Sequence, residues 1–205
     1  MIKKSIAFTL AESLLVMGVI GIVATLVVPN LKNNSEDQVY VAKARKVYTE
    51  IETAYERAVL KYGDPKDWAQ AQTNAHLQEF LNVKKVCTDA TCTQSMAVCR
   101  KNYAILKDGS SFCCGYVYYV INTSDLIVDL DGPQKGYNTE GKDIFRIHIE
   151  LGNGITTSKI RAFHHTPVSG AAPDNSDYLQ WILDYGNMDY NKGCGVAWET
   201  KTSCK

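Results

Sequence analysis

The chain has 205 residues, of which 45% are hydrophobic, 22 are basic and 22 are acidic. This size and apolar content suffice for one soluble domain with an appended segment. Because the net charge is zero, nucleic acid is not an expected partner, and broad attraction to anionic lipid surfaces is not expected either.

Seven cysteines indicate the compartment in which most of the chain folds. All of them lie beyond residue 86, and so many cysteines are unusual in a reducing compartment. Disulfides, and therefore an extracytoplasmic location, are expected for the C-terminal two thirds. No Cys-x-x-Cys spacing supports a zinc site. Three bridges and one free thiol allow many pairings, which stay open for Cys87, Cys92, Cys99, Cys113 and Cys114.

The N-terminus has the charge and apolar pattern of a membrane segment. Residues 1–7 contain Lys3 and Lys4 and no acid, and the apolar run 8–28 ends before Pro29. As a helix this run would extend about 31 Å, at about 1.5 Å per residue, which matches the hydrocarbon core of a bilayer. The positive-inside rule then keeps the N-terminus cytoplasmic and places the rest of the chain across the membrane.

Glu12 distinguishes this run from a cleavable secretory signal, which is the alternative interpretation. An acid costs about 2.5 to 3.5 kcal/mol at the centre of a bilayer, and signal peptides normally carry no charge in their apolar region. The run is also long for such a signal and has no small-x-small cleavage site before Pro29. Some interaction of the Glu12 carboxylate is therefore expected to offset the cost of placing it in the membrane.

The sequence from Ala7 to Glu12, Ala-Phe-Thr-Leu-Ala-Glu, followed by an apolar helix and Pro29, resembles the class III signal of type IV prepilins and type II secretion pseudopilins. The resemblance implies cleavage between Ala7 and Phe8 by a prepilin peptidase, which also N-methylates Phe8. Glu12 becomes the fifth mature residue, and Pro29 matches a helix-bending proline of many family members. Ala7 departs from the usual glycine, but alanine is the next smallest residue, so cleavage is expected to survive.

The resemblance also implies a role for Glu12 in filament assembly. Its carboxylate would meet the free amino terminus of a neighbouring subunit, and such a pair at about 4 Å is worth roughly 4 kcal/mol at an effective dielectric of 20. The alternative is an acid at the membrane edge that reaches back to water. The implied partners are the prepilin peptidase/methyltransferase, copies of the chain or related pilins, and an inner-membrane assembly platform.

Beyond Pro29 an amphipathic helix is predicted within residues 29–63, because apolar residues recur at three- and four-residue steps from Tyr40 to Tyr62. The sequence Gly63-Asp64-Pro65 is expected to end this helix and to begin a second one that extends to about Leu81. Together with the membrane segment, this predicts one long N-terminal helix.

Short strands are predicted after residue 100, and their pattern indicates an antiparallel sheet of four or five strands. Residues 107–110, Lys-Asp-Gly-Ser, are expected to form a hairpin turn. The predicted fold class is α+β, with the long helix packed on the sheet as in the lollipop architecture of pilins. The expected organisation is a leader (1–7), an assembly helix (8–28), an amphipathic helix (29–63) and a globular, disulfide-bonded head (64–205).

Clustered carboxylates in the head suggest a calcium site with Asp129, Asp131 and Asp143 as ligands. The segment is not an EF-hand, because Gln134 stands where that loop needs glycine. The alternative is a solvated acidic turn between two strands. The resemblance further implies that Cys194 and Cys204 pair to close a C-terminal loop, as pilin heads often do.

The expected function is that of a structural filament subunit, anchored in a bacterial inner membrane before it polymerises into a pilus or a secretion pseudopilus. A minor or tip pilin for adhesion or DNA uptake, and a membrane-anchored extracytoplasmic enzyme, are the alternatives. The chain lacks Gly-x-Ser-x-Gly, His-Glu-x-x-His and phosphate-loop motifs, so enzymatic activity is not expected.

Overall fold

The computed structural model describes residues 10–68, 70–88, 103–118, 123–133, 135–152, 158–162 and 167–204. The chain divides into two units, Met1–Val39 and Tyr40–Lys205. The cleavage residues Ala7 and Phe8 lie outside the described residues.

Helix α1, Leu10–Tyr62, starts in the first unit and ends in the second. In the first unit, large apolar side chains between positions 14 and 22 are exposed to solvent. No helix within the described residues is both long and apolar enough to cross a membrane. The membrane-spanning half of the predicted helix therefore stays a prediction.

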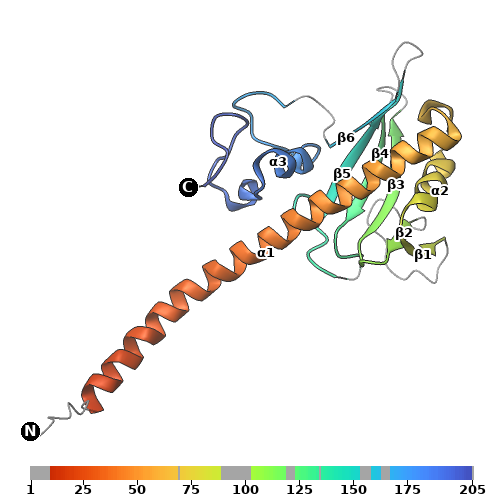
Figure 1. The fold of residues 1–205 in the computed structure, drawn as a ribbon. Helices are drawn as coiled ribbons and strands as arrows, with labels where there is room; N and C mark the ends of the chain where they lie inside the picture. The colour runs from red at the N-terminus through yellow and green to blue at the C-terminus, as the bar shows by residue number, and fades with distance from the viewer. Residues whose placement is uncertain are drawn as a thin grey trace, which may run out of the picture. The chain divides into compact units, whose positions relative to one another are not determined.

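The second unit is built around the part of α1 that follows Val39 (Figure 1). Its buried side chains recur at the predicted three- and four-residue steps: Tyr40, Val41, Ala44, Val47, Ile51, Ala54, Tyr55 and Ala58. The helix ends where predicted, because Gly63 adopts a left-handed φ of 83° and donates its N–H to the carbonyl oxygen of Val59 at 2.9 Å.

A six-stranded antiparallel sheet forms the centre of this unit, and its strands lie in sequence order. The α+β class is therefore confirmed, with one or two more strands than predicted. The strands are β1 (Val83–Cys87), β2 (Tyr103–Leu106), β3 (Ser111–Tyr118), β4 (Thr123–Asp129), β5 (Ile144–Glu150) and β6 (Lys159–Arg161). The hairpin turn predicted at residues 107–110 connects β2 and β3.

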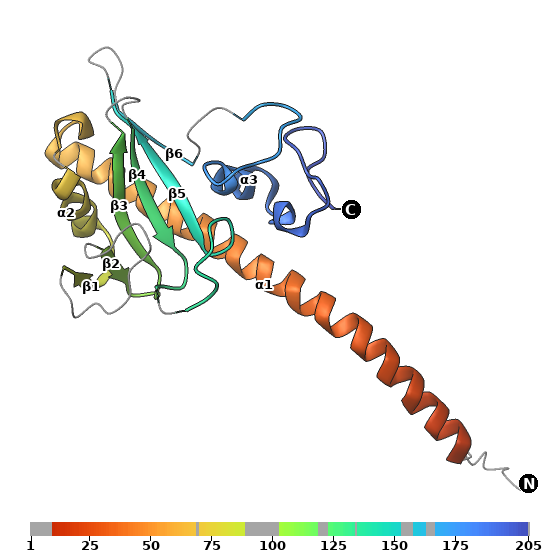
Figure 2. The same cartoon turned by 180° about the vertical axis from the view of Figure 1, so that it is seen from behind.

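Side chains alternate between the two faces of the sheet along each strand, and each face carries a cluster of buried residues. Figures 1 and 2 show α1 and α2 (Gln70–Phe80) against one face. There Leu77 and the α1 side chains pack with strand residues such as Phe112, Leu126 and Ile147. A smaller cluster on the other face contains Cys113 and Ile127.

The C-terminal segment adds two helices that were not predicted, α3 (Tyr178–Tyr185) and the 3₁₀ helix η2 (Asp189–Lys192). Trp181 of α3 is fully buried and packs edge-on against Trp198, with ring centroids 5.0 Å apart. The predicted second helix begins as a 3₁₀ turn, η1 (Pro65–Asp67), where the Asp64 side chain accepts the N–H of Lys66 at 3.0 Å. It then continues as α2 after a break.

Candidate functional site

The predicted assembly residues lie in or near the N-terminal part of α1. Glu12 and Pro29 are within the helix, although their side chains lie outside the described residues. The described side chains that follow Glu12 are exposed by about half to two thirds of their surface: Leu14 63%, Leu15 69%, Val16 47%, Met17 71%, Val19 54%, Ile20 61% and Ile22 65%. Four consecutive helical residues point in all directions around the axis, so the apolar surface surrounds the helix.

An exposed apolar surface of this extent normally marks an interaction site with a membrane or with another protein. Gly18 lies within this stretch, and the place of a Cβ there meets no atom within 4 Å. Small residues allow apolar helices to approach one another closely. The stretch can therefore bury itself in lipid or among other apolar helices.

Of the three predicted calcium ligands, Asp129 is the last residue of β4, and Asp131 and Asp143 lie in the connection from β4 to β5. Asp129 is fully buried, and its Oδ1 accepts the N–H groups of Asp131 at 3.2 Å and Gly132 at 2.9 Å. The hydroxyl of Tyr40 on α1 donates to Oδ2 of Asp131 at 3.1 Å, which attaches the loop to the helix.

Asp143 organises the same loop from its other end. Its carboxylate accepts the backbone N–H groups of Tyr137, Asn138 and Thr139 at 2.5, 2.6 and 2.7 Å. Gly136 has a φ of 69°, and a Cβ there would overlap with Oδ2 of Asp131 and with Oδ2 of Asp143. The two carboxylates therefore converge on a glycine that no larger residue can replace without moving them.

Two buried carboxylate oxygens, Oδ2 of Asp129 and Oδ1 of Asp131, have no hydrogen-bond donor among the residues that the structure describes. The pKa of Asp129 is raised to about 7, chiefly by burial and to a lesser extent by the neighbouring carboxylates of Asp131 and Asp143, against the lowering effect of its two backbone donors. One added positive charge, from a proton or a cation, would stabilise this arrangement.

Calcium binding at this loop stays a prediction. The structure brings Asp129, Asp131 and Asp143 into one loop, but three backbone N–H groups already occupy the oxygens of Asp143. Among the described residues, no group of three or more His, Cys, Asp or Glu side chains is arranged to hold a metal ion. The buried carboxylates also show that the turn is not simply solvated, because Asp129 and Asp143 have no exposed surface.

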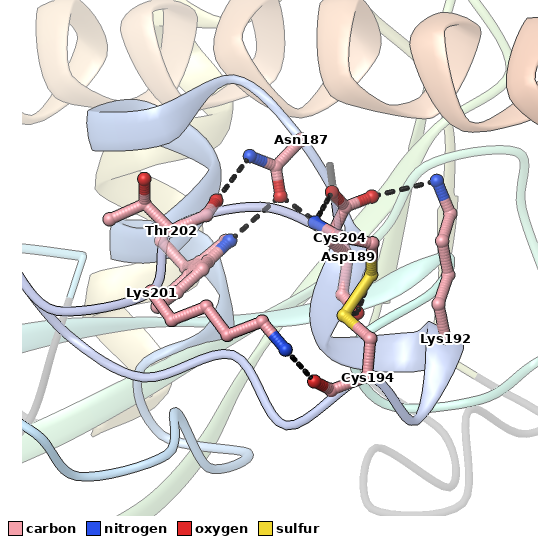
Figure 3. Close-up of a disulfide and its surroundings, with 8 residues drawn as sticks. Asn187, Asp189, Lys192, Cys194, Lys201, Thr202 and Cys204 are labelled. Atoms are coloured by element: carbon pink, nitrogen blue, oxygen red, sulfur yellow. Dashed lines mark hydrogen bonds and ion pairs between the residues drawn. A yellow bond between two sulfur atoms is a disulfide. The ribbon is translucent and has the colours of Figure 1, made fainter.

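Cys194 and Cys204 form a disulfide, which is the pairing that the resemblance implied. Figure 3 shows the surrounding contacts. Asp189 accepts the N–H of Cys204 at 2.8 Å and forms an ion pair with Lys192 at 2.7 Å, so one carboxylate connects η2 with the C-terminal end. Asn187 donates to the carbonyl oxygen of Thr202 at 2.9 Å, and this bond closes the loop a second time.

Three of the remaining cysteines belong to strands of the sheet, Cys87 to β1 and Cys113 and Cys114 to β3. Cys87 and Cys113 are buried and disulfide-bonded. Cys92 and Cys99 lie outside the described residues, as does the side chain of Cys114. The prediction that the head contains disulfides is confirmed for these cysteines.

Sequence reasoning missed a charge network on the face of the sheet opposite α1. Asp125 of β4 and His148 of β5 are cross-strand partners, and Nδ1 of His148 lies 2.8 Å from Oδ1 of Asp125. Arg146 approaches Oδ2 of Asp125 to 3.6 Å and donates to Glu140 at 2.5 Å. Alternating charged residues in adjacent strands could have suggested the pairing, but the strand register was needed to establish it.

A comparison with models of protein families, with curated proteins and with solved structures finds no match.

Proposed function

We propose that the chain is a structural subunit of a type IV pilus-like or type II secretion pseudopilus filament. It is made as a prepilin, cleaved between Ala7 and Phe8, N-methylated at Phe8 and polymerised through its N-terminal helix. A prepilin peptidase/methyltransferase, copies of the chain or related pilins, and an inner-membrane assembly platform are its partners.

The observation that carries the proposal is the change in character along α1. From Leu14 to Ile22 the described apolar side chains are exposed, whereas from Tyr40 to Ala58 the apolar side chains are buried in the core of the head. A helix that is apolar on all sides needs lipid or other helices around it, and one that is apolar on a single stripe needs one packing surface. A subunit stored in a membrane and later packed into a filament core meets both requirements.

Before assembly, the chain is anchored in the bacterial inner membrane with its N-terminus in the cytoplasm and its head outside. Lys3 and Lys4 support this orientation, since basic residues favour the cytoplasmic side. The disulfide between Cys194 and Cys204 supports it from the other end of the chain, because disulfides persist outside the cytoplasm.

Glu12 is the residue that makes the helix specific for assembly. A carboxylate in an apolar helix is costly unless it is paired, and cleavage before Phe8 creates a free amino group four residues away in sequence on every subunit. The amino terminus of a neighbour is then the available cation, and the pair sets the register between adjacent helices.

The variant Glu12→Ala tests this role. Membrane insertion and cleavage are expected to continue in this variant, as measured by fractionation and by the mass of the mature chain, while filaments disappear in electron micrographs. The matched control is Glu56→Ala, which removes an exposed glutamate of the same helix outside the apolar stretch. Normal filaments from Glu12→Ala, or equal loss from both variants, would contradict the assigned role.

The filament's machinery can be identified by two further observations. Filament abundance distinguishes a major subunit from a minor or tip subunit for adhesion or DNA uptake. Loss of protein secretion on deletion of the chain distinguishes a pseudopilus from a pilus.

A further inference from the structure

The charge network on the sheet reaches the segment 174–177, which leads into α3, at two points. The Nε2 atom of His148 lies 3.3 Å from the carbonyl oxygen of Ser176. The side chain of Asn175 donates to Oε2 of Glu140 at 3.0 Å. His148 and Glu140 are linked through Asp125 and Arg146, so the two contacts belong to one continuous network.

The partners of His148 determine the protons on its ring. A carbonyl oxygen can only accept a hydrogen bond, and so can an ionised carboxylate. With Asp125 at one ring nitrogen and Ser176 at the other, both contacts are hydrogen bonds only when both nitrogens carry a proton. His148 and Asp125 are only 2% and 3% exposed, so solvent does not substitute for either partner.

The charges in the network balance when His148 is protonated. Asp125 and Glu140 contribute two negative charges, and Arg146 and His148 contribute two positive charges. Loss of the imidazolium proton leaves a buried negative charge without its closest cation, which is unfavourable. The other charged groups on the elements around the ring are Asp129 on β4, Glu150 on β5, Lys159 and Arg161 on β6, with Arg161 opposite His148, and Asp174 and Asp177 in the segment that contains Ser176.

We propose that His148 is a pH-sensitive latch that holds the segment 174–177 on the sheet. A neutral ring keeps one proton, and it keeps it on Nδ1 because the charged acceptor Asp125 lies closer than the carbonyl of Ser176. The lone pair of Nε2 then faces the carbonyl oxygen of Ser176, and the contact between β5 and the segment is lost.

The release is local, because other contacts continue to hold the C-terminal segment. Trp181 stays in its aromatic cluster, and the disulfide between Cys194 and Cys204 closes the final loop. Tyr190 donates to the carbonyl oxygen of Gly141 at 2.7 Å. Rising pH therefore releases Ser176 from β5 without unfolding the head, while Asn175 keeps its hydrogen bond to Glu140. The latch is independent of the filament proposal.

Nuclear magnetic resonance of the full chain in detergent tests the latch. The ¹⁵N shifts of the His148 ring report its protonation, and the ¹³C shift of the Ser176 carbonyl reports the contact. Both signals are expected to change over the same pH interval, with Nε2 as the nitrogen that loses its proton. A Ser176 signal that stays constant while His148 titrates would overturn the proposal, as would a ring that is neutral in the closed state or that keeps both protons until the head unfolds.

Two variants separate the latch from general pH effects. His148→Gln cannot change its charge in this range, so the Ser176 signal is expected to lose its pH dependence. His76→Gln is the matched control, because His76 stacks on Tyr62, outside the network, with ring centroids 3.8 Å apart. The proposal would also be overturned if the ¹³C shift of Ser176 kept its pH dependence in His148→Gln, or lost it in His76→Gln. The wild-type comparison remains decisive if His148→Gln does not fold.

Discussion

Arg45 and Ile182 are 137 positions apart in sequence, yet the guanidinium of Arg45 donates to the carbonyl oxygen of Ile182 from Nε at 3.3 Å and from Nη2 at 3.1 Å. A further bond from Nη2 reaches the carbonyl oxygen of Leu183 at 3.0 Å. These carbonyls belong to the last turn of α3, where a cation is favourable, and that of Ile182 also accepts the N–H of Gly186 at 3.0 Å. Arg45 thus attaches the C-terminal segment to α1.

Replacing Arg45 is expected to weaken this attachment. Arg45→Ala should lower the free energy of unfolding of the head by about 1 to 2 kcal/mol, because a hydrogen bond to a charged group is worth about 1.5 to 3 kcal/mol and this side chain is exposed. Denaturant unfolding monitored by tryptophan fluorescence measures the change. Arg45→Lys is the control that keeps the positive charge but loses the paired N–H donors of the guanidinium. Its free energy of unfolding should lie between those of the wild type and Arg45→Ala. An unchanged midpoint for Arg45→Ala would show that α3 does not depend on this contact.

The C-terminal disulfide should contribute measurably to stability. Cys194 and Cys204 are separated by 10 positions, and a bridge across a loop of this size stabilises a protein by about 2 to 3 kcal/mol, chiefly by restricting the unfolded chain. The double variant Cys194→Ser, Cys204→Ser should show this loss in denaturant unfolding. Because the hydrogen bond from Asn187 to Thr202 also holds the two ends of the loop together, we expect the loop to fold in the variant. Complete loss of the head's cooperative unfolding transition would contradict that expectation.

The raised pKa of Asp129 predicts a pH dependence of stability. In the folded head its pKa is about 7, compared with an ordinary 3.8, so the folded state holds a proton that the unfolded chain has released. The free energy of unfolding should therefore decrease as pH rises from about 4 to about 7, by on the order of a few kcal/mol, and then level off. Asp129→Asn, which is neutral throughout, should remove this decrease and be more stable than the wild type at neutral pH.

The same measurements test the predicted calcium site. If Asp129 and Asp131 bind calcium, excess calcium should compete with the proton and restore stability near pH 7 in the wild type but not in Asp129→Asn. Magnesium, which requires a stricter geometry, is the control cation. Identical unfolding curves with and without calcium, and no binding heat by calorimetry, would exclude the site.

Elements whose signal is local in sequence were predicted correctly. The buried stripe from Tyr40 to Ala58 follows directly from helical spacing, and Gly63 marks the end of α1 because its left-handed φ suits glycine. The hairpin at residues 107–110 was predicted from turn chemistry alone. These features need no information about distant parts of the chain.

The missed features depend on tertiary contacts or carry weak local signals. Strand β1 has Lys84 and Lys85 exposed at the edge of the sheet, so it lacks an alternating apolar pattern. Helix α3 has only eight residues, and Asp177 at its N-cap makes no capping hydrogen bond. The partnership of Asp125 with His148 requires the register of two strands, which short strands do not reveal in sequence.

Mass spectrometry of the mature N-terminus tests the central proposal most directly. If the chain is a processed prepilin, the purified protein lacks residues 1–7 and begins with N-methylated Phe8. Because Ala7 stands where the resembling family usually has glycine, a remaining fraction of uncleaved chain is compatible with the proposal. A chain that begins only at Met1, or that is cut after Pro29, would contradict it.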